Sequence, residues 1–476
     1  MNISVFKSFP KLHYPNLMAD LQKSVQADNH KIVVLDDDPT GVQTLHDVPV
    51  FTDWSIDSIR EGFQEKGKLF YILTNSRSFS VAQTTAAHKE IIHNVLSVSK
   101  EQQRPFLIIS RSDSTLRGHY PLETELLREG IEKAGTCKVD GEILCPYFKE
   151  GGRFTFGDVH YVKYGDELVP AGETEFAKDK TFGYHASNLR DYIEEKTHGT
   201  FLRNEVVSVS IEELRSGQID KIADKLCKVK NFGKIIVNAI TQDDVRVFVL
   251  ALYQALACGK YFLFRTAAPF VKEMGAVTDA PLLTAKELFH DQSSSSGNGG
   301  VIVVGSHTAK TTAQLAELHK MPSLLFRELN SDLVLDPEAF HAEVEQVLQW
   351  ENEQIAKDKT VVIYTKRQVL TRPDDTKEAA LARSVKISNA VQSLVGKLKV
   401  KPAYVLAKGG ITSSDVGTKA LRVHKAWVLG QICPGVPVWQ TDTNSLFPGI
   451  PYVIFPGNVG TKDTLFQAVL TLESRK

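Results

Sequence analysis

Three carboxylates stand next to one another in the run Asp-Asp-Asp-Pro-Thr-Gly at residues 36–41. Adjacent carboxylates repel one another, so a cation or a substrate hydroxyl is their natural partner. A capped turn is the structural alternative, because all four residue types are common in turns. We favour the functional interpretation, since carboxylates that are hard to ionise side by side are typical of active sites. The members expected to contact a ligand are Asp36, Asp37, Asp38, Thr40 and Gly41.

A second polar run, Arg-Ser-Asp-Ser-Thr-Leu-Arg-Gly, begins at Arg111. Arg111 and Arg117 can each grip a carboxylate with two parallel hydrogen bonds, while Asp113 and Ser114 can bind sugar hydroxyls. This combination suits a small polyhydroxy acid. The alternative is an Arg–Asp pair that only pins a loop.

Arg153 follows Gly152 and is a further candidate for holding a carboxylate, although a lone arginine beside glycine is more often a surface residue. Histidines 160, 307 and 424 lack the spacing of metal ligands, and we expect structural or exposed positions for them. The sequence therefore predicts no protein metal site.

Three other runs place glycine directly after a predicted strand, at residues 305–308, 409–412 and 457–460. Such turns expose backbone N–H groups and the positive end of a helix, which favours phosphate. Ordinary tight turns are the alternative, but three in one region favour a nucleotide or a phosphorylated ligand. Neither GxxxxGK[ST] nor GxGxxG is present. The expected contacts are Ser306, Thr308, Gly409, Gly410, Thr412, Gly457, Asn458 and Gly460.

Alternating strands and helices must position these runs. Apolar stretches predict strands, and four-residue apolar spacing predicts helices between them. The predicted strands are residues 32–35, 69–73, 106–109, 143–145, 234–239, 301–304, 360–364, 404–407 and 452–455. Residues 151–170 have no clear periodicity and predict a β-rich excursion. The pattern is typical of an α/β fold with mainly parallel sheets, in which ligands bind beyond the carboxyl ends of strands.

The stretch Ser-Ser-Ser-Ser-Gly-Asn-Gly-Gly at residues 293–300 has the composition of a flexible linker. It predicts an N-terminal α/β domain over residues 1–292 and a C-terminal α/β domain over residues 301–476, a division expected for 476 residues.

Bulk composition excludes several functions. Lys plus Arg (56) nearly balances Asp plus Glu (57), so no global field recruits nucleic acid or an anionic membrane. No apolar run is long enough to cross a bilayer. Five cysteines without CxxC spacing argue against a disulfide or zinc framework, and a cytoplasmic location is expected.

In its motifs the chain resembles the four-carbon acid sugar kinases, a family first catalogued without a known function. The resemblance spans nearly the whole chain. The family's Asp-Asp-x-Thr-Gly, Asp-Ser-Thr-Leu-Arg-Gly and Gly-Arg-x-Thr are matched at residues 37–41, 113–118 and 152–155. Its Gly-Ser…Thr…Gln, Gly-Gly-x-Thr and Gly-Asn-x-Gly are matched at residues 305–314, 409–412 and 457–460.

The resemblance implies an N-terminal domain for a sugar acid, a C-terminal domain for ATP, and an active site in the cleft between them. Family members phosphorylate acids such as threonate, erythronate or their 3-oxo forms. Ile411 stands where the family usually has an acidic residue, and Asp36 and Pro39 replace what is more often Ala and Leu. Nucleotide choice and the acceptor pocket are therefore expected to differ from those of better-known members.

We expect an ATP-dependent kinase of a small, four-carbon sugar acid that uses Mg²⁺, with no nucleic acid or membrane partner and with a homodimer as the expected assembly. Asp37 would orient and deprotonate the acceptor hydroxyl, and Asp38 would bind substrate or metal. Arg111, Arg117 and Arg153 would hold the carboxylate or the transferred phosphoryl group.

Two alternatives remain. Asp36-x-Asp38-x-Thr40 after a strand is also the nucleophile signature of haloacid-dehalogenase-like phosphatases, in which Asp36 would form a phospho-aspartate and Asp38 would act as acid and base. This fold also needs a lysine and a later acidic pair, for which Gln242-Asp243-Asp244 is a poor candidate, and it leaves the glycine turns unexplained. The second alternative is a nucleotide-binding regulatory protein without catalysis, for which Ile411 is the sole support.

Overall fold

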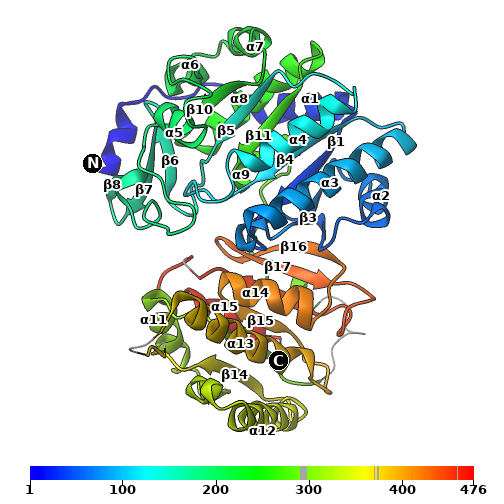
Figure 1. Cartoon of the computed structure of the whole chain (residues 1–476), viewed down its shortest axis with the longest axis vertical. Coiled ribbons are helices and arrows are strands. Elements are labelled where there is room, and N and C mark those ends of the chain that lie inside the picture. Colours follow the sequence, from blue (N-terminus) through cyan, green and yellow to red (C-terminus); the bar gives the residue numbers. More distant parts are fainter. Residues whose placement is uncertain (290–296, 369, 373–374, 458, 476) are drawn as a thin grey trace. The chain divides into compact units, whose positions relative to one another are not determined.

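The protein is described by a computed structural model that covers residues 1–289, 297–368, 370–372, 375–457 and 459–475, without the side chains of residues 377, 378 and 381. The chain divides into two compact units, which we describe separately. The first comprises Met1–Gly41 and Asp53–Asp279, and the second comprises Val42–Thr52 and Ala280–Lys476. Figure 1 shows the course of the chain.

The first unit is built on a parallel sheet of seven strands, as expected from the alternation of strands and helices. Because all strands run the same way, their carboxyl ends meet at one edge, where Asp36 pairs with Arg111 and Arg111 with Thr266. In spatial order the strands are β3 (Leu69–Leu73), β1 (Lys31–Asp36), β4 (Phe106–Arg111), β11 (Phe262–Thr266), β5 (Gly141–Cys145), β10 (Gly233–Val237) and β9 (Val207–Val209).

Helices cover this sheet and bury its apolar strands; β1, β3 and β4 are buried along their whole length. A capping box starts α3, where Ser80 and Gln83 satisfy each other's backbone N–H groups. The helices are α1 (Leu17–Ala27), α2 (Ile56–Gln64), α3 (Val81–Glu101), α4 (Leu122–Lys133), α5 (Leu189–Lys196), α6 (Ile211–Arg215), α7 (Ile219–Cys227), α8 (Gln242–Ala257) and α9 (Ala268–Met274).

The predicted β-rich excursion is confirmed as a separate antiparallel sheet of β6 (Arg153–Phe156), β7 (Val159–Tyr164) and β8 (Glu167–Pro170). It joins the rest of the first unit through a bridge between Thr155 and Ala239. This small sheet carries Arg153 and His160, and the ring of His160 contacts Ser114 of the 113–118 loop.

The second unit has a mixed sheet of eight strands, parallel on one side and antiparallel on the other. The three strands that precede the glycine turns are neighbours in it. In spatial order the strands are β13 (Leu324–Leu329), β14 (Thr360–Thr365), β12 (Val301–Val304), β15 (Val405–Lys408), β18 (Pro451–Phe455), β17 (Val436–Thr441), β16 (Lys425–Cys433) and β2 (Val48–Phe51).

Helices α11 and α15 pack against each other on this sheet, and their apolar side chains join a core that includes Leu315, Leu318, Leu465 and Val469. The helices of the second unit are α10 (Ala285–Leu288), α11 (Ala309–Leu318), α12 (Pro337–Ile355), α13 (Lys377–Gly396), α14 (Gly410–Asp415) and α15 (Thr464–Glu473).

Two segments group differently from the expected division at residues 293–300. Residues 42–52 belong to the second unit because β2 pairs with β16, and residues from Ala280 onward do so as well, since the N–H of Leu283 donates to the carbonyl of Gln431. Residues 293–296 of the expected linker lie outside the described residues. Gly299 and Gly300 are buried against Lys359 and Tyr404 at the start of β12.

Candidate active site and nucleotide site

Asp36 ends β1 and is the most enclosed of the three adjacent carboxylates, with 1% of its surface exposed. The Nη1 atom of Arg111, on the neighbouring strand β4, lies 3.0 Å from Asp36 Oδ1. Gly41 folds back over the carboxylate, and a Cβ atom at this position would lie 2.0 Å from both oxygens. Burial, only partly offset by Arg111, raises the pKa of Asp36 to about 7. Asp36 is therefore held inside the site wall.

Asp37 is the carboxylate that has an oxygen free to act. Its Oδ1 accepts from the same Nη1 of Arg111 at 3.2 Å, whereas its Oδ2 is buried and has no hydrogen-bond partner among the described residues. Burial raises the pKa of Asp37, although Arg77 and Arg111 oppose the rise. A buried carboxylate oxygen without a donor costs free energy unless a ligand completes it. Asp37 can accept a proton or a hydroxyl hydrogen bond.

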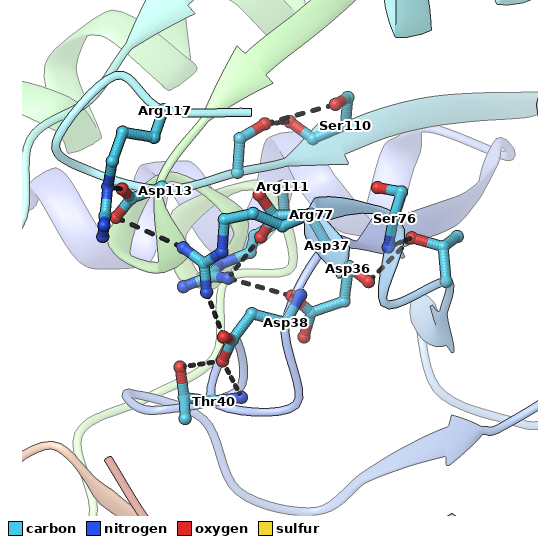
Figure 2. Close-up of polar contacts among 12 residues, drawn as sticks. Asp36, Asp37, Asp38, Thr40, Ser76, Arg77, Ser110, Arg111, Asp113 and Arg117 are labelled. Carbon is cyan, nitrogen blue, oxygen red and sulfur yellow. Dashed lines mark hydrogen bonds and ion pairs between the residues drawn. The ribbon is translucent and has the colours of Figure 1, made fainter. Parts of the chain in front are cut away.

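Asp38 is held by protein partners on both oxygens (Figure 2). Its Oδ1 accepts from the N–H and the hydroxyl of Thr40 at 2.9 and 2.5 Å. Its Oδ2 accepts from Arg77, whose other terminal nitrogen lies 3.5 Å from Asp113. Burial opposes ionisation, but Arg77 and Thr40 more than compensate and lower the pKa of Asp38. Asp38 is therefore an ionised carboxylate.

Arg77 was missed by the sequence analysis. It lies in the short helical turn Ser76–Ser78 after β3, and its guanidinium joins the Asp-Asp-Asp run to the 113–118 loop. The signal was available, because the polar residues 74–77 directly follow a predicted strand next to β1. A cation between two carboxylates also explains how they tolerate burial.

The 113–118 loop is held in place by side chains that donate hydrogen bonds to its successive carbonyl groups. His160 donates to the carbonyl of Ser114 at 2.7 Å, Tyr184 to that of Thr115 at 2.7 Å, and Tyr192 to that of Leu116 at 2.9 Å. Burial lowers the pKa of His160 to about 4, so the ring is neutral and its Nδ1 accepts from the Thr155 hydroxyl at 2.9 Å.

Arg265 completes this series by donating to the carbonyl of Arg117 at 2.9 Å, while its Nη1 binds Glu123 at 2.6 Å. All of these donors come from segments far from the loop in sequence. The loop is therefore a rigid part of the site, and Ser114 lies within it as a buried residue.

Two arginines that were predicted to hold a carboxylate contact the same aromatic ring. The guanidinium carbons of Arg117 and Arg153 lie 5.2 and 5.4 Å from the centre of the Phe176 ring. Arg117 also binds Asp113 at 2.7 Å, so the loop-pinning pair exists. Arg153 is buried, against the surface alternative, and donates to the carbonyl of Gly151, while its Nε has no partner among the described residues. Arg153 is a buried cation with capacity for an anion.

In the second unit, the turns after β12 and β15 interlock. A Cβ atom at Gly305 would lie 2.3 Å from the hydroxyl of Thr412. Gly409 adopts a φ of +124°, which side chains avoid, and a Cβ atom there would lie 3.1 Å from that of Ser306. Gly410 begins α14 next to these residues. Because Gly305, Gly409 and Gly410 have no side chains, a ligand can approach the backbone of these turns closely.

The third turn lies beside the first. The hydroxyl of Ser306 accepts from that of Thr311 at 3.1 Å, and the hydroxyl of Thr308 lies 3.5 Å from the carbonyl of Gly457. Gly460 is exposed further along the same turn. Asn458 lies outside the described residues. The three glycine turns that were predicted from separate runs are therefore gathered at one sheet edge.

Two cations at this edge were missed by the sequence analysis. Lys408 directly precedes Gly409, is fully buried, and donates to the carbonyl of Pro456 at 2.6 Å. Burial lowers the pKa of Lys408 to about 7. Arg367, in the segment after β14, donates to the carbonyl of Ser306. Lys408 ties the second turn to the third, and Arg367 ties the segment after β14 to the first turn, where it adds positive charge.

No group of three or more His, Cys, Asp or Glu side chains is arranged to hold a metal ion in the part of the chain that the structure describes. Ile411, at the position where an acidic residue is usual in the family, is 71% exposed on α14.

Comparison with known proteins now adds to this geometry. Residues 32–274 match a family model described as a sugar-binding N-terminal domain, and residues 301–465 match one described as a nucleotide-binding C-terminal domain. The chain belongs to the four-carbon acid sugar kinase family. The kinase-family fold thus places the carboxylate and arginine cluster in a sugar-binding domain and the three glycine turns in a nucleotide-binding domain. A search of curated protein sequences found no match.

Solved structures share the fold of this kinase-family chain. A Haemophilus influenzae protein from a domain family of unknown function matches with a TM-score of 0.60 and 17% identity, over 92% of this chain and 100% of its own. A Salmonella typhimurium LT2 protein, provisionally named a tRNA synthase, matches with a TM-score of 0.67 and 17% identity, over 92% of this chain and 98% of its own. At this identity the likeness concerns the fold alone. Among the described residues, no helix has the length and apolar character needed to cross a membrane.

Proposed function

We propose that this protein is an ATP-dependent kinase that phosphorylates a hydroxyl group of a small, four-carbon sugar acid. The observation that carries the proposal is Asp37, whose Oδ2 is buried and unpartnered among the described residues while Arg111 holds its Oδ1. A hydroxyl of the substrate would supply the missing donor. Asp37 would then orient this hydroxyl and take its proton as the oxygen attacks the terminal phosphate.

The raised pKa of Asp37 suits this role, because a stronger base accepts the proton more readily. The positive charges of Arg77 and Arg111 oppose this rise and favour the ionised carboxylate. Asp38 stays a proposed ligand of substrate or metal. Since Thr40 and Arg77 occupy both of its oxygens, such a ligand would share them or displace one partner.

The carboxylate of the sugar acid would bind Arg153 and Arg117. Arg153 brings a buried positive charge whose pKa is lowered by burial, so an anion would restore the lost solvation. Phe176 lies beside both guanidinium groups, and this contact reduces the side-chain entropy that they lose on binding. Asp113 and Ser114 would meet the hydroxyls, as sugar-binding side chains do.

The nucleotide would bind the turns at residues 305–308, 409–412 and 457–460 through backbone N–H groups and the hydroxyls of Ser306, Thr308 and Thr412. Lys408 and Arg367 add positive charge beside them. Magnesium bound to the phosphates would neutralise their charge during transfer. The chain's own residues do the rest, since phosphoryl transfer depends mainly on positioning and on the exclusion of water.

Neither alternative is favoured by a specific observation. A phosphatase nucleophile must reach a phosphate, but Asp36 lies under Gly41 and binds Arg111. The regulatory alternative rests on Ile411 alone, which is an exposed residue. This alternative also gives no role to the unpartnered Oδ2 atom of Asp37.

The test is a screen for ADP release with Mg-ATP and a panel of four-carbon aldonic, 3-oxo and hydroxy acids, with three- and five-carbon acids for comparison. We expect at least one four-carbon acid to be phosphorylated faster than its shorter and longer analogues. Formation of a phospho-aspartate from a phosphorylated acid, with no ADP release from any acid, would replace the kinase by the phosphatase.

A further inference from the structure

Two of the five cysteines lie at the ends of neighbouring helices in the first unit. Cys227 is the last residue of α7, and Cys258 directly follows the last residue of α8. Strand β10 lies between them in sequence, so the fold and not a local motif brings them together. Cys258 is exposed and Cys227 is half-buried, which leaves both thiols within reach of a small reagent.

The sheet topology places these two helix ends side by side. Strand β10 lies between β9 and β5, and β11 lies beyond β5, so the crossovers through α7 and α8 step across the sheet in the same direction. Because crossovers between parallel strands are right-handed, both helices lie on the same face of the sheet. They pack against each other and end at the amino edge of the sheet, opposite to the candidate active site.

Cys227 continues the apolar face of α7. The buried residues of this helix recur at the spacing of a single helix face and are Ile219, Ile222, Ala223 and Leu226. Cys227 stands four residues after Ala223, so its side chain lies above that of Ala223 at the end of the same face. Its partial burial agrees with this position. The thiol is therefore on the packed side of the helix.

The segments that follow the two helices are held together by one ammonium group. Lys260 is two residues after Cys258, and its Nζ donates to the carbonyl of Val229 at 2.9 Å. Val229 is in turn two residues after Cys227. The same Nζ binds Asp140 at 2.8 Å, directly before β5, which ties both segments to the sheet. These hydrogen bonds fix the separation of the two helix ends.

The two thiols are themselves neighbours. Desolvation raises the pKa of Cys227, and Cys258 raises it further by charge repulsion and by a hydrogen bond between the side chains, whereas Lys260 opposes the rise. A hydrogen bond between thiols requires their sulfur atoms to be close. Rotation about the side-chain bonds can then bring them to the ~2.05 Å of a disulfide bond.

We propose that Cys227 and Cys258 form a reversible disulfide bond by exchange with a small-molecule disulfide such as oxidised glutathione. The exposed Cys258 loses its proton and attacks one sulfur of the small disulfide, which leaves a mixed disulfide and releases one small thiolate. Cys227 then loses its proton, attacks the Cys258 sulfur and releases the second thiolate. The released thiolates take up the two protons. The protein thiols are thus oxidised by two electrons, and the small disulfide is reduced by the same two.

A bond of this kind is a modification and not a structural framework. Disulfides in reducing compartments are usually transient or redox-sensing, and thiol exchange makes this one responsive to the ratio of small thiol to small disulfide. It links α7 to α8 at the edge opposite to the candidate active site. The exchange needs neither a nucleotide nor a sugar acid, so it is independent of the proposed kinase function.

The test is incubation of the full chain with oxidised glutathione, followed by mass spectrometry of the intact protein and of its unreduced peptides. In the wild type we expect a loss of the mass of two hydrogen atoms and a linked pair of peptides that contain Cys227 and Cys258. Excess dithiothreitol should reverse both changes. Cys227→Ser should instead retain one glutathione on Cys258, because the thiol that displaces it is absent.

Cys137→Ser is the matched control, because Cys137 is a half-buried cysteine elsewhere in the same unit. This variant should form the linked pair of peptides as the wild type does. A wild type that keeps glutathione on Cys258 without closing the bond would overturn the proposal, and so would a wild type in which neither thiol reacts. Linkage of either cysteine to Cys137 would overturn it as well.

Discussion

Gly41 lies so close to Asp36 that a methyl group on its Cα would sit 2.0 Å from each carboxylate oxygen. The glycine of the Asp-Asp-Asp-Pro-Thr-Gly run is therefore required by packing. Its proposed contact with substrate is an additional role. Because the chain turns here by passing over Asp36, this carboxylate is sealed in and Asp37 becomes the one with an oxygen available.

The first prediction concerns Gly41→Ala. The added methyl group must displace a buried carboxylate, so we expect a loss of stability of about 2 kcal/mol or more in urea denaturation. Gly67→Ala is the control, since the nearest atom to a Cβ there is a carbonyl oxygen at 3.8 Å. Equal stability of the two variants would contradict the packing that we describe.

The second prediction concerns the pH dependence of Asp36→Asn. In the folded protein the pKa of Asp36 is raised to about 7, so the folded state holds a proton that the unfolded state releases near pH 3.8. The stability that this group contributes is complete below pH 3.8 and is lost as pH rises through about 7.

Asparagine resembles the protonated acid and has no such loss. The stability of Asp36→Asn relative to the wild type should therefore increase between pH 5 and pH 8, by roughly 3 kcal/mol. Denaturation curves of both proteins at the two pH values provide the measurement. A difference that does not vary with pH would show that Asp36 is already ionised at pH 5.

These predictions depend on contacts of which only a part could be foreseen. The strands and the edge at which their carboxyl ends meet follow from apolar runs. The position of Asp36 beside Arg111 required the register of the two strands, which the structure gives. The convergence of three glycine turns likewise required the order of the strands, in which β12, β15 and β18 are neighbours.

The position of Arg77 after a predicted strand was visible in the sequence, but its contact with Asp38 was not, because the turn that carries it begins at Asn75 with a left-handed φ of 54°. The hydrogen bonds of Tyr184 and Tyr192 to the 113–118 loop join residues about 70 positions apart, and no local pattern encodes them. The short run of β2 carries no information about its partner β16, so its assignment to the second unit also required the structure.

The third prediction concerns Arg77→Ala. This change leaves Asp38 and Asp113 without the cation that lies between them, and a buried carboxylate without its partner typically costs about 3 kcal/mol. We expect a loss of stability of this size in denaturation experiments, together with reduced turnover. Arg60→Ala removes an arginine that pairs with carboxylates on the surface and should leave stability near that of the wild type.

Should the two variants be equally stable, Arg77 would not be the cation that makes burial of these carboxylates tolerable. Arg77→Lys separates charge from geometry in the same assay. It keeps the positive charge but cannot span both carboxylates, so we expect an intermediate stability.

The fourth prediction concerns Thr412, whose hydroxyl occupies the space that a side chain at Gly305 would need. Thr412→Val keeps the shape and removes the hydroxyl. If this hydroxyl donates to phosphate, ADP affinity should fall about tenfold, the value of one hydrogen bond to a charged group. Thr412→Ser retains the hydroxyl and should bind ADP like the wild type. Titration calorimetry of both variants measures these affinities. If Thr412→Ser weakened ADP binding and Thr412→Val did not, packing of the methyl group and not the hydroxyl would be responsible.

The central claim is that the free oxygen of Asp37 takes the proton of the acceptor hydroxyl. Asp37→Asn keeps the shape of the side chain and removes its basicity. With the acid that the wild type phosphorylates, we predict that kcat of this variant falls by about 100-fold or more, while the Kd for ADP stays unchanged. A kcat within about threefold of the wild type, at unchanged ADP affinity, would contradict the assignment of Asp37 as the base.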